Sequence, residues 1–66
     1  MKTKLEKLVH DVRNPLNSIS VNAELAKVLL NHPGSSEQVL NALDTIIREC
    51  KKCNEVLNSS QQYLAE

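Results

Sequence analysis

Apolar side chains recur every three or four residues through the first half of the chain, which is the spacing of one face of an α-helix. They form three neighbouring rows that repeat every seven residues: Leu5, Val12, Ile19 and Ala26; Val9, Leu16, Ala23 and Leu30; and Leu8 and Leu29, with Pro15 and Asn22 between them. The pattern predicts one long helix over about residues 3–31, with an apolar stripe three rows wide.

The second half repeats the pattern after a short break. Residues 31–35, Asn-His-Pro-Gly-Ser, contain the single glycine and one of the two prolines, which predicts a loop at about residues 32–35. Beyond it, steps of four and three carry Val39, Leu43, Ile46, Cys50, Cys53, Leu57, Ser60 and Leu64, with Leu40 and Ile47 widening the stripe. A second helix is expected over about residues 36–65, with Ser35 as its N-cap and Gln38 completing a capping box.

Two helices of nearly equal length joined by a short loop form an antiparallel hairpin. Both apolar stripes are wider than the seam that one partner helix covers. A chain of 66 residues also buries only about 60% of the surface that its unfolded form exposes, so its own core is marginal. We therefore expect an all-α protein of one domain, in which two helical hairpins form a homodimeric four-helix bundle.

Charge and composition narrow the function classes. Eight basic and eight acidic side chains give a formal net charge of zero, which argues against nucleic-acid binding. No apolar run approaches the length of a membrane span, and the basic N-terminus leads into a helical pattern rather than a signal-peptide core. The expected location is cytoplasmic, where cysteines are reduced thiols.

The stretch from His10 to Pro15 is unusual for a helix interior. Pro15 removes the hydrogen bond to the carbonyl of Asp11, which costs about 3 kcal/mol or more. Asn14 could instead cap a new helix that begins at Pro15, but the apolar rows pass through the proline without changing phase, which favours one bent helix. His10 falls on the side of the helix away from the apolar stripe. An outward histidine is typical of a solvated surface, yet a costly proline beside it suggests a specific role.

Residues 10–19, His-Asp-Val-Arg-Asn-Pro-Leu-Asn-Ser-Ile, resemble the phosphoacceptor motif of bacterial sensor histidine kinases: histidine, acid, aliphatic, basic, Asn or Thr, proline, leucine. The hairpin resembles the dimerisation and histidine phosphotransfer domain of these kinases, although the second helix matches in pattern alone. The resemblance implies a module of two-component signal transduction that relays phosphate between an ATP-binding kinase domain and an aspartate of a response regulator.

The resemblance also implies a role for each motif residue. His10 would be the phosphoacceptor, because a neutral imidazole is a good nucleophile and its phosphoramidate is a reactive donor. Asp11 would be its acid/base partner, accepting a hydrogen bond from Nδ1–H; the alternative is an ordinary solvated acid. Asn14 would position water for dephosphorylation of the regulator, and Pro15 would supply the helix bend.

A second apolar strip lies beside the main stripe. Val21, Leu25 and Val28 mark either a wider dimer interface or a protein-binding surface. The resemblance favours docking of a response-regulator receiver domain, with contacts to Asn17, Ser18, Val21, Asn22 and Leu25.

The resemblance is incomplete in one respect. A sensor kinase also has an ATP-binding domain with Asn-rich and Gly-rich boxes, whereas this sequence has a single glycine. We therefore expect that the chain binds no cofactor, that a separate histidine kinase catalytic domain supplies ATP, and that the chain alone has no kinase activity. A fragment of a kinase and a free-standing phosphotransfer protein both fit the sequence.

Cys50 and Cys53 have the C-x-x-C spacing of zinc and redox sites. A closed zinc site needs four ligands and a redox pair favours a helix N-terminus, whereas these two lie in mid-helix. Packing in the core is therefore the favoured interpretation, and no metal is expected. Two alternatives remain: a purely structural dimerisation hairpin without phosphorylation, and a metal or redox hairpin built on the two cysteines.

Overall fold

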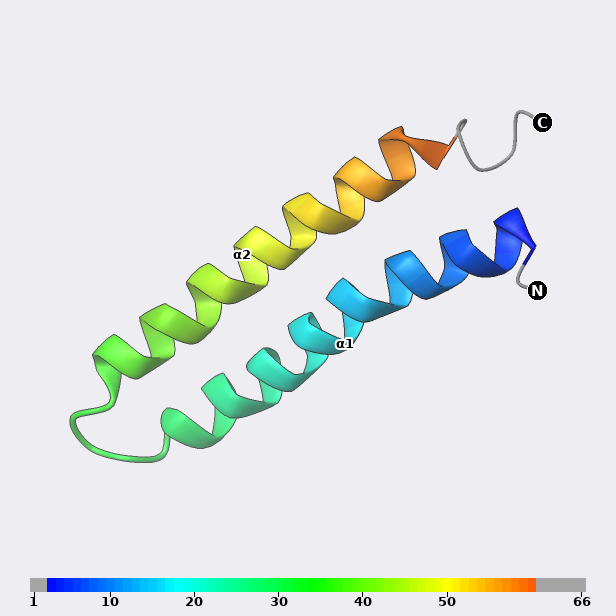
Figure 1. Ribbon diagram of the computed structural model, residues 1–66. Coiled ribbons are helices and arrows are strands. Elements are labelled where there is room, and N and C mark those ends of the chain that lie inside the picture. The colour runs from blue at the N-terminus through cyan, green and yellow to red at the C-terminus, as the bar shows by residue number, and fades with distance from the viewer. Residues whose placement is uncertain (1–2, 61–66) are drawn as a thin grey trace.

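The computed structural model describes residues 3–60, which form two antiparallel helices. Helix α1 (Lys4–Leu29) and helix α2 (Ser36–Asn58) lie side by side, and the chain enters and leaves at the same end of the hairpin (Figure 1). The described residues contain no strand, so the prediction of an all-α helical hairpin is confirmed. Leu64 and the last residues of the predicted second helix lie outside the described residues.

A capping box starts α1. Thr3 has an extended backbone (φ −70°, ψ 166°), so its Oγ1 accepts a hydrogen bond from the backbone N–H of Glu6 at 3.1 Å. The Glu6 carboxylate accepts in return from the N–H of Thr3 at 3.1 Å. The helix then continues through Pro15 without interruption, which confirms one helix rather than two meeting at Asn14.

The loop at the tip reverses the chain at Gly34. Its φ of 77° lies in the left-handed region that side chains other than glycine rarely adopt. The ring Nδ1 of His32 lies 3.0 Å from the carbonyl oxygen of Val28, so His32 caps the C-terminal end of α1.

The expected capping box at the start of α2 is not formed. Ser35 occupies the N-cap position, but its side chain makes no capping hydrogen bond. Its backbone (φ −98°, ψ 11°) is not extended, as N-cap residues usually are, so its hydroxyl is not aimed at the first turn. The Ser35 carbonyl instead accepts the first helical hydrogen bond, from Val39 N–H at 2.9 Å.

The helices meet along a seam that is only partly apolar. The main seam residues, all buried or half-buried, are Leu8, Asp11, Val12, Pro15, Ser18, Ile19, Asn22, Ala26 and Leu29 of α1, and Val39, Ala42, Thr45, Ile46, Glu49, Cys53 and Val56 of α2. Among the described apolar residues apart from Pro15, only Ala26 and Ala42 are buried, at 7% and 3% exposed. A single hairpin therefore has almost no closed core.

The larger remaining apolar residues of the main stripes form what we call the outer apolar face. It consists of Leu5, Val9 and Leu16 of α1, the C-cap residue Leu30, and Leu40, Leu43, Ile47, Cys50 and Leu57 of α2, all exposed. One groove on this face joins Val9 and Leu16 to Leu57, and another joins Leu30 to Leu40, so both helices contribute to the same side. Within residues 3–60, neither helix has an apolar stretch long enough to cross a membrane.

Candidate functional site

His10 lies in the second turn of α1 with its side chain 54% exposed. Its Nδ1 is 3.6 Å from Oδ1 of Asp11, within ion-pair range but longer than a hydrogen bond. The contact occupies the Nδ1 side of the ring, and Nε2 lies on the opposite side. Neighbouring helical residues rarely meet, so this pair depends on the side-chain rotamers that bring them together.

Asp11 lies at the edge of the seam, with its side chain 25% exposed. In addition to His10, it contacts Lys7, whose Nζ lies 3.5 Å from Oδ2. The carboxylate therefore has a basic group on both sides. A positive charge that develops on the His10 ring would lie next to the negative charge of Asp11, which would stabilise it.

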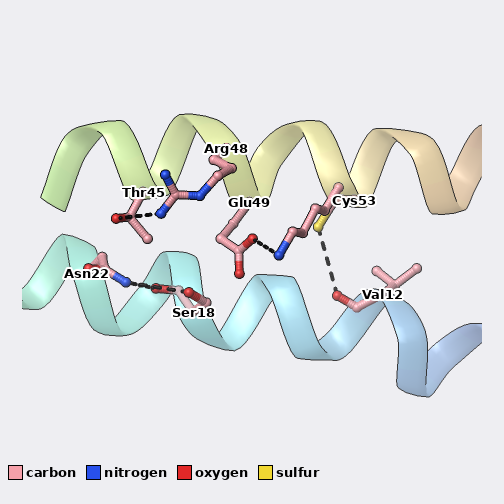
Figure 2. A network of polar contacts seen from close by, with 8 residues as sticks. Val12, Ser18, Asn22, Thr45, Arg48, Glu49 and Cys53 are labelled. Atoms are coloured by element: carbon pink, nitrogen blue, oxygen red, sulfur yellow. Dashed lines mark hydrogen bonds and ion pairs between the residues drawn. The ribbon is translucent and has the colours of Figure 1, made fainter. Parts of the chain in front are cut away.

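Asn14 and Pro15 follow one turn later and point in different directions. Asn14 is exposed and lies one helical turn from His10, so both side chains project from the same face. Pro15 is buried in the seam against α2. Figure 2 shows Cys53 of α2 pointing to Val12 in this region, with its Sγ 3.9 Å from the Val12 carbonyl oxygen.

The face that carries His10 and Asn14 continues toward the loop. Steps of three and four residues place Asn17, Val21, Leu25 and Val28 on it, and all four are exposed. Val21 is 66% exposed, Leu25 46% and Val28 55%, so this face carries an exposed apolar strip between the histidine and the loop. We call this set the His10 face; its members are His10, Asn14, Asn17, Val21, Leu25 and Val28.

A groove between the two helices runs beside the part of the His10 face that is nearer the loop. It is lined by Asn22, Leu25, Leu29, Gln38, Asn41, Ala42 and Thr45. Leu25 belongs to both the His10 face and this groove, so the groove begins at the edge of that face.

Ser18 and Asn22 lie at the inner edge of this surface, half-buried in the seam. The Asn22 amide donates to the Ser18 carbonyl oxygen at 2.8 Å and approaches its hydroxyl at 3.4 Å. On the other side of the seam, within α2, Arg48 donates to the hydroxyl of Thr45 at 3.2 Å (Figure 2). The polar section of the seam formed by these residues was not predicted, although the four-residue spacing of Ser18 and Asn22 indicates a local contact.

The two helices and the histidine motif match a known protein family. The family whose model matches this chain is HisKA, the His Kinase A (phospho-acceptor) domain, and the match spans residues 4–63. The chain belongs to the HisKA family. Membership covers both helices, so the resemblance seen at the histidine motif extends to the second helix. Comparison with curated proteins and with solved structures finds no match.

A HisKA domain provides a histidine phosphoacceptor for two-component signalling. This HisKA domain has two histidines, and their surroundings differ. His10 stands on a helix beside a carboxylate, whereas His32 lies in the loop with Nδ1 against the Val28 carbonyl. Only His10 carries the acid, the asparagine and the proline of the motif after it.

The polar section of the seam contains a carboxyl group whose pKa is shifted, that of Glu49. Glu49 lies 3.0 Å from Lys52 Nζ, with its side chain 14% exposed. The hydrogen bond from Lys52 is the main cause that lowers the pKa of Glu49 below its ordinary value of 4.5, against the opposing effect of burial. The charge of Lys52, a hydrogen bond from Ser18 and the charge of Arg48 lower it further.

The two cysteines of the HisKA domain occupy different environments. Cys53 is half-buried in the seam, whereas Cys50 is exposed on the outer apolar face, and both are free thiols. Within one hairpin, Cys53 packs in the seam as predicted, and Cys50 lies outside the seam. Packing of Cys50 in the core of a dimer stays a prediction. Within residues 3–60, no group of three or more His, Cys, Asp and Glu side chains is arranged to hold a metal ion.

Proposed function

We propose that His10 is the phosphoacceptor of this HisKA domain and that the chain relays phosphate between a histidine kinase catalytic domain and a response-regulator receiver. The observation that supports this role best is the arrangement at His10. The ring is exposed, and a carboxylate lies 3.6 Å from Nδ1, which leaves Nε2 on the outer side of the pair. His32 makes its closest contact through Nδ1 to a backbone carbonyl instead.

The chemistry requires two displacements at phosphorus. In the first, the Nε2 lone pair of His10 attacks the γ-phosphorus of ATP, and the bond to the leaving ADP oxygen breaks. The ring then carries a positive charge, which the Asp11 carboxylate stabilises from the Nδ1 side. In the second, a carboxylate oxygen of the receiver attacks the phosphorus, the P–N bond breaks, and His10 recovers its neutral form.

Asn14 and Pro15 support the same site from the next turn. The Asn14 side chain shares the His10 face and is therefore placed to orient a water molecule toward a phosphorylated receiver. Pro15 lacks the N–H that would bond to the carbonyl of Asp11, so the helix can bend between His10 and the surface below it. Such a bend would let one histidine face two different partners.

In this proposal the receiver domain docks on α1 between His10 and the loop. Asn17, Val21 and Leu25 offer an exposed surface of mixed polarity, and Ser18 and Asn22 form its inner edge beside α2. An apolar strip flanked by polar side chains is typical of a protein-binding surface. A receiver held there would present its aspartate toward His10. The ATP comes from the separate catalytic domain, and the chain itself binds no cofactor.

Two hairpins associate through their outer apolar faces to form a homodimeric four-helix bundle. Nine apolar residues on this face remain exposed within one hairpin. Full burial of a Leu, Ile or Val side chain contributes about 1.5–3 kcal/mol, so covering this face supplies the core that a single hairpin lacks. The His10 face lies on another side of α1 and stays open to partners in such a bundle.

The proposal is tested by phosphorylation of the chain with separately supplied histidine kinase catalytic domains and radiolabelled ATP. We expect label that is stable in base and lost in acid, as a phosphoramidate is, and that His10→Gln abolishes. Helicity and dimerisation should be nearly unchanged in this variant, since exposed positions tolerate substitution within about 0.5 kcal/mol.

Two further variants sharpen this test. Asp11→Asn should slow labelling, because it keeps the shape of the side chain but removes its charge, and His32→Gln is the matched control that should label normally. Label that persists in His10→Gln would contradict the assignment. If no catalytic domain or phosphorylated receiver in a panel labels the chain, the purely structural dimerisation hairpin becomes the better account.

A further inference from the structure

Cys53 makes a contact that the phosphoacceptor role does not use. Its Sγ lies 3.9 Å from the carbonyl oxygen of Val12, and the two residues are 41 positions apart. The other side-chain contacts in Figure 2 join residues three or four positions apart on one helix. The thiol therefore connects α2 directly to the backbone of α1.

The contact lies at the turn of α1 that lacks a backbone hydrogen bond because of Pro15. Pro15 cannot donate to the carbonyl of Asp11, so the helix lacks one backbone hydrogen bond at this turn. The adjacent carbonyl, that of Val12, is the one that faces the Cys53 thiol. Pro15 itself is buried against α2, so the seam contacts replace part of the constraint that the missing hydrogen bond would have provided.

This turn separates two functional parts of α1. His10 lies before it, and the strip of Val21, Leu25 and Val28 lies after it. A receiver bound to the strip can take the phosphoryl group only if the two parts keep a fixed relation. A displacement of the reacting atoms by about 1 Å can lower a rate by about 100-fold, so a small change of the bend is sufficient to affect transfer.

We propose that Cys53 is a positioning residue, which holds the Pro15 turn of α1 against α2 and so aligns His10 with a receiver docked on the His10 face. The thiol is a weak donor, and its small side chain is half-buried in the same seam in which Pro15 is buried. This inference rests on the proposed function of His10. It concerns transfer to the receiver and not the capture of phosphate by His10.

The test compares Cys53→Ala, Cys53→Ser and Cys53→Val with Cys50→Ala. Cys50 is the matched control for the seam contact, since it is the same residue type three positions away on the same helix but lies outside the seam, on the outer apolar face that the proposed dimer covers. Each chain is phosphorylated by the same catalytic domain and radiolabelled ATP, separated from it, and mixed with increasing concentrations of one receiver domain.

Cys53→Ala and Cys53→Val should lower the maximal transfer rate about tenfold or more, while phosphorylation of His10 by the catalytic domain changes less than about twofold. The receiver concentration that gives half the maximal rate should stay the same, because the docking strip is unchanged. Cys53→Ser keeps a donor of similar size and should restore most of the rate. Cys50→Ala removes no seam contact, so even if it weakens the dimer, the ratio of its transfer rate to its phosphorylation rate should stay at the wild-type value.

Reversible modification separates positioning from misfolding. In a Cys50→Ala background, methyl methanethiosulfonate converts the Cys53 thiol to a methyl disulfide and releases methanesulfinic acid. Transfer should slow, and dithiothreitol, which reduces the mixed disulfide, should restore it. If all Cys53 variants transfer at the wild-type rate, or if phosphorylation and transfer fall together with thermal stability, Cys53 is not a positioning residue. Absence of label in the wild-type chain would instead overturn the proposed function.

Discussion

Ile47 and Val28 are equally exposed in one hairpin, at 55% each, but lie on different faces. Ile47 belongs to the outer apolar face, which the proposed homodimer covers, and Val28 belongs to the His10 face, which it leaves open. Both are β-branched helical residues, and the hairpin itself buries the same fraction of each side chain. Ile47→Ala and Val28→Ala therefore form a matched pair that reports on the dimer alone.

The expected magnitude follows from the exposed fraction. Truncation of a fully buried Ile to Ala costs about 2–5 kcal/mol, and about half of that belongs to contacts made on dimerisation when 55% of the side chain is exposed in the hairpin. A symmetric dimer contains two copies, so Ile47→Ala should weaken association by about 2–5 kcal/mol in total. That raises the dissociation constant about 30- to 4,000-fold. Val28→Ala should change it by less than about fivefold, since exposed positions lie within about 0.5 kcal/mol per copy, or about 1 kcal/mol for the two copies.

Sedimentation equilibrium over a range of protein concentrations measures both dissociation constants. The wild-type chain should have twice the chain mass at micromolar concentration, and Ile47→Ala should show dissociation in the same range. Equal effects of the two substitutions would refute the assignment of the dimer to the outer apolar face. A folded wild-type monomer at micromolar concentration would refute the bundle itself.

Two further predictions concern the seam and the docking surface. The lowered pKa of Glu49 means that its ionised form stabilises the fold above its ordinary pKa of 4.5 and that this stabilisation is lost as the pH falls through the lower folded value. Thermal unfolding should therefore show Glu49→Gln less stable than wild type near neutral pH, with the difference shrinking below 4.5; a constant difference would contradict it. Val21→Arg and Leu25→Arg should each weaken receiver binding by about 1 kcal/mol or more without dissociating the dimer, as titration calorimetry and sedimentation can show. Dissociation would place these two residues in the dimer interface.

The sequence was sufficient to predict the hairpin, because its signals are local. The apolar rows keep their phase through Pro15, and a helix that ended there would have reset them. The turn also has a clear local signal, because residues 31–35 contain the single glycine and a proline. In the structure the chain reverses at Gly34, whose φ is 77°. The capping box of Thr3 and Glu6 was not among the predictions, although the three-residue spacing of these residues is a local signal for it. The capping box predicted at Ser35 does not form, because the backbone of Ser35 has a different conformation.

The division of the apolar stripe could not be predicted in the same way. Periodicity shows that Cys50 and Cys53 belong to one broad stripe, but it does not show where the partner helix lies across that stripe. The structure places Cys53 in the seam and Cys50 outside it. The contact from Cys53 to Val12, 41 positions away, likewise depends on how the two helices align and has no local signal.

If His10 is the phosphoacceptor, phosphate is carried on its Nε2. Mass spectrometry of the labelled wild-type chain, digested at neutral or basic pH and fragmented by electron transfer so that the phosphoramidate survives, locates the phosphate. We expect phosphate on the peptide that contains His10 and none on the peptide that contains His32, and phosphorus NMR of the same sample should give the signal of an Nε2-linked phosphohistidine. Phosphate mapped to His32, or to a serine or threonine hydroxyl, would contradict it.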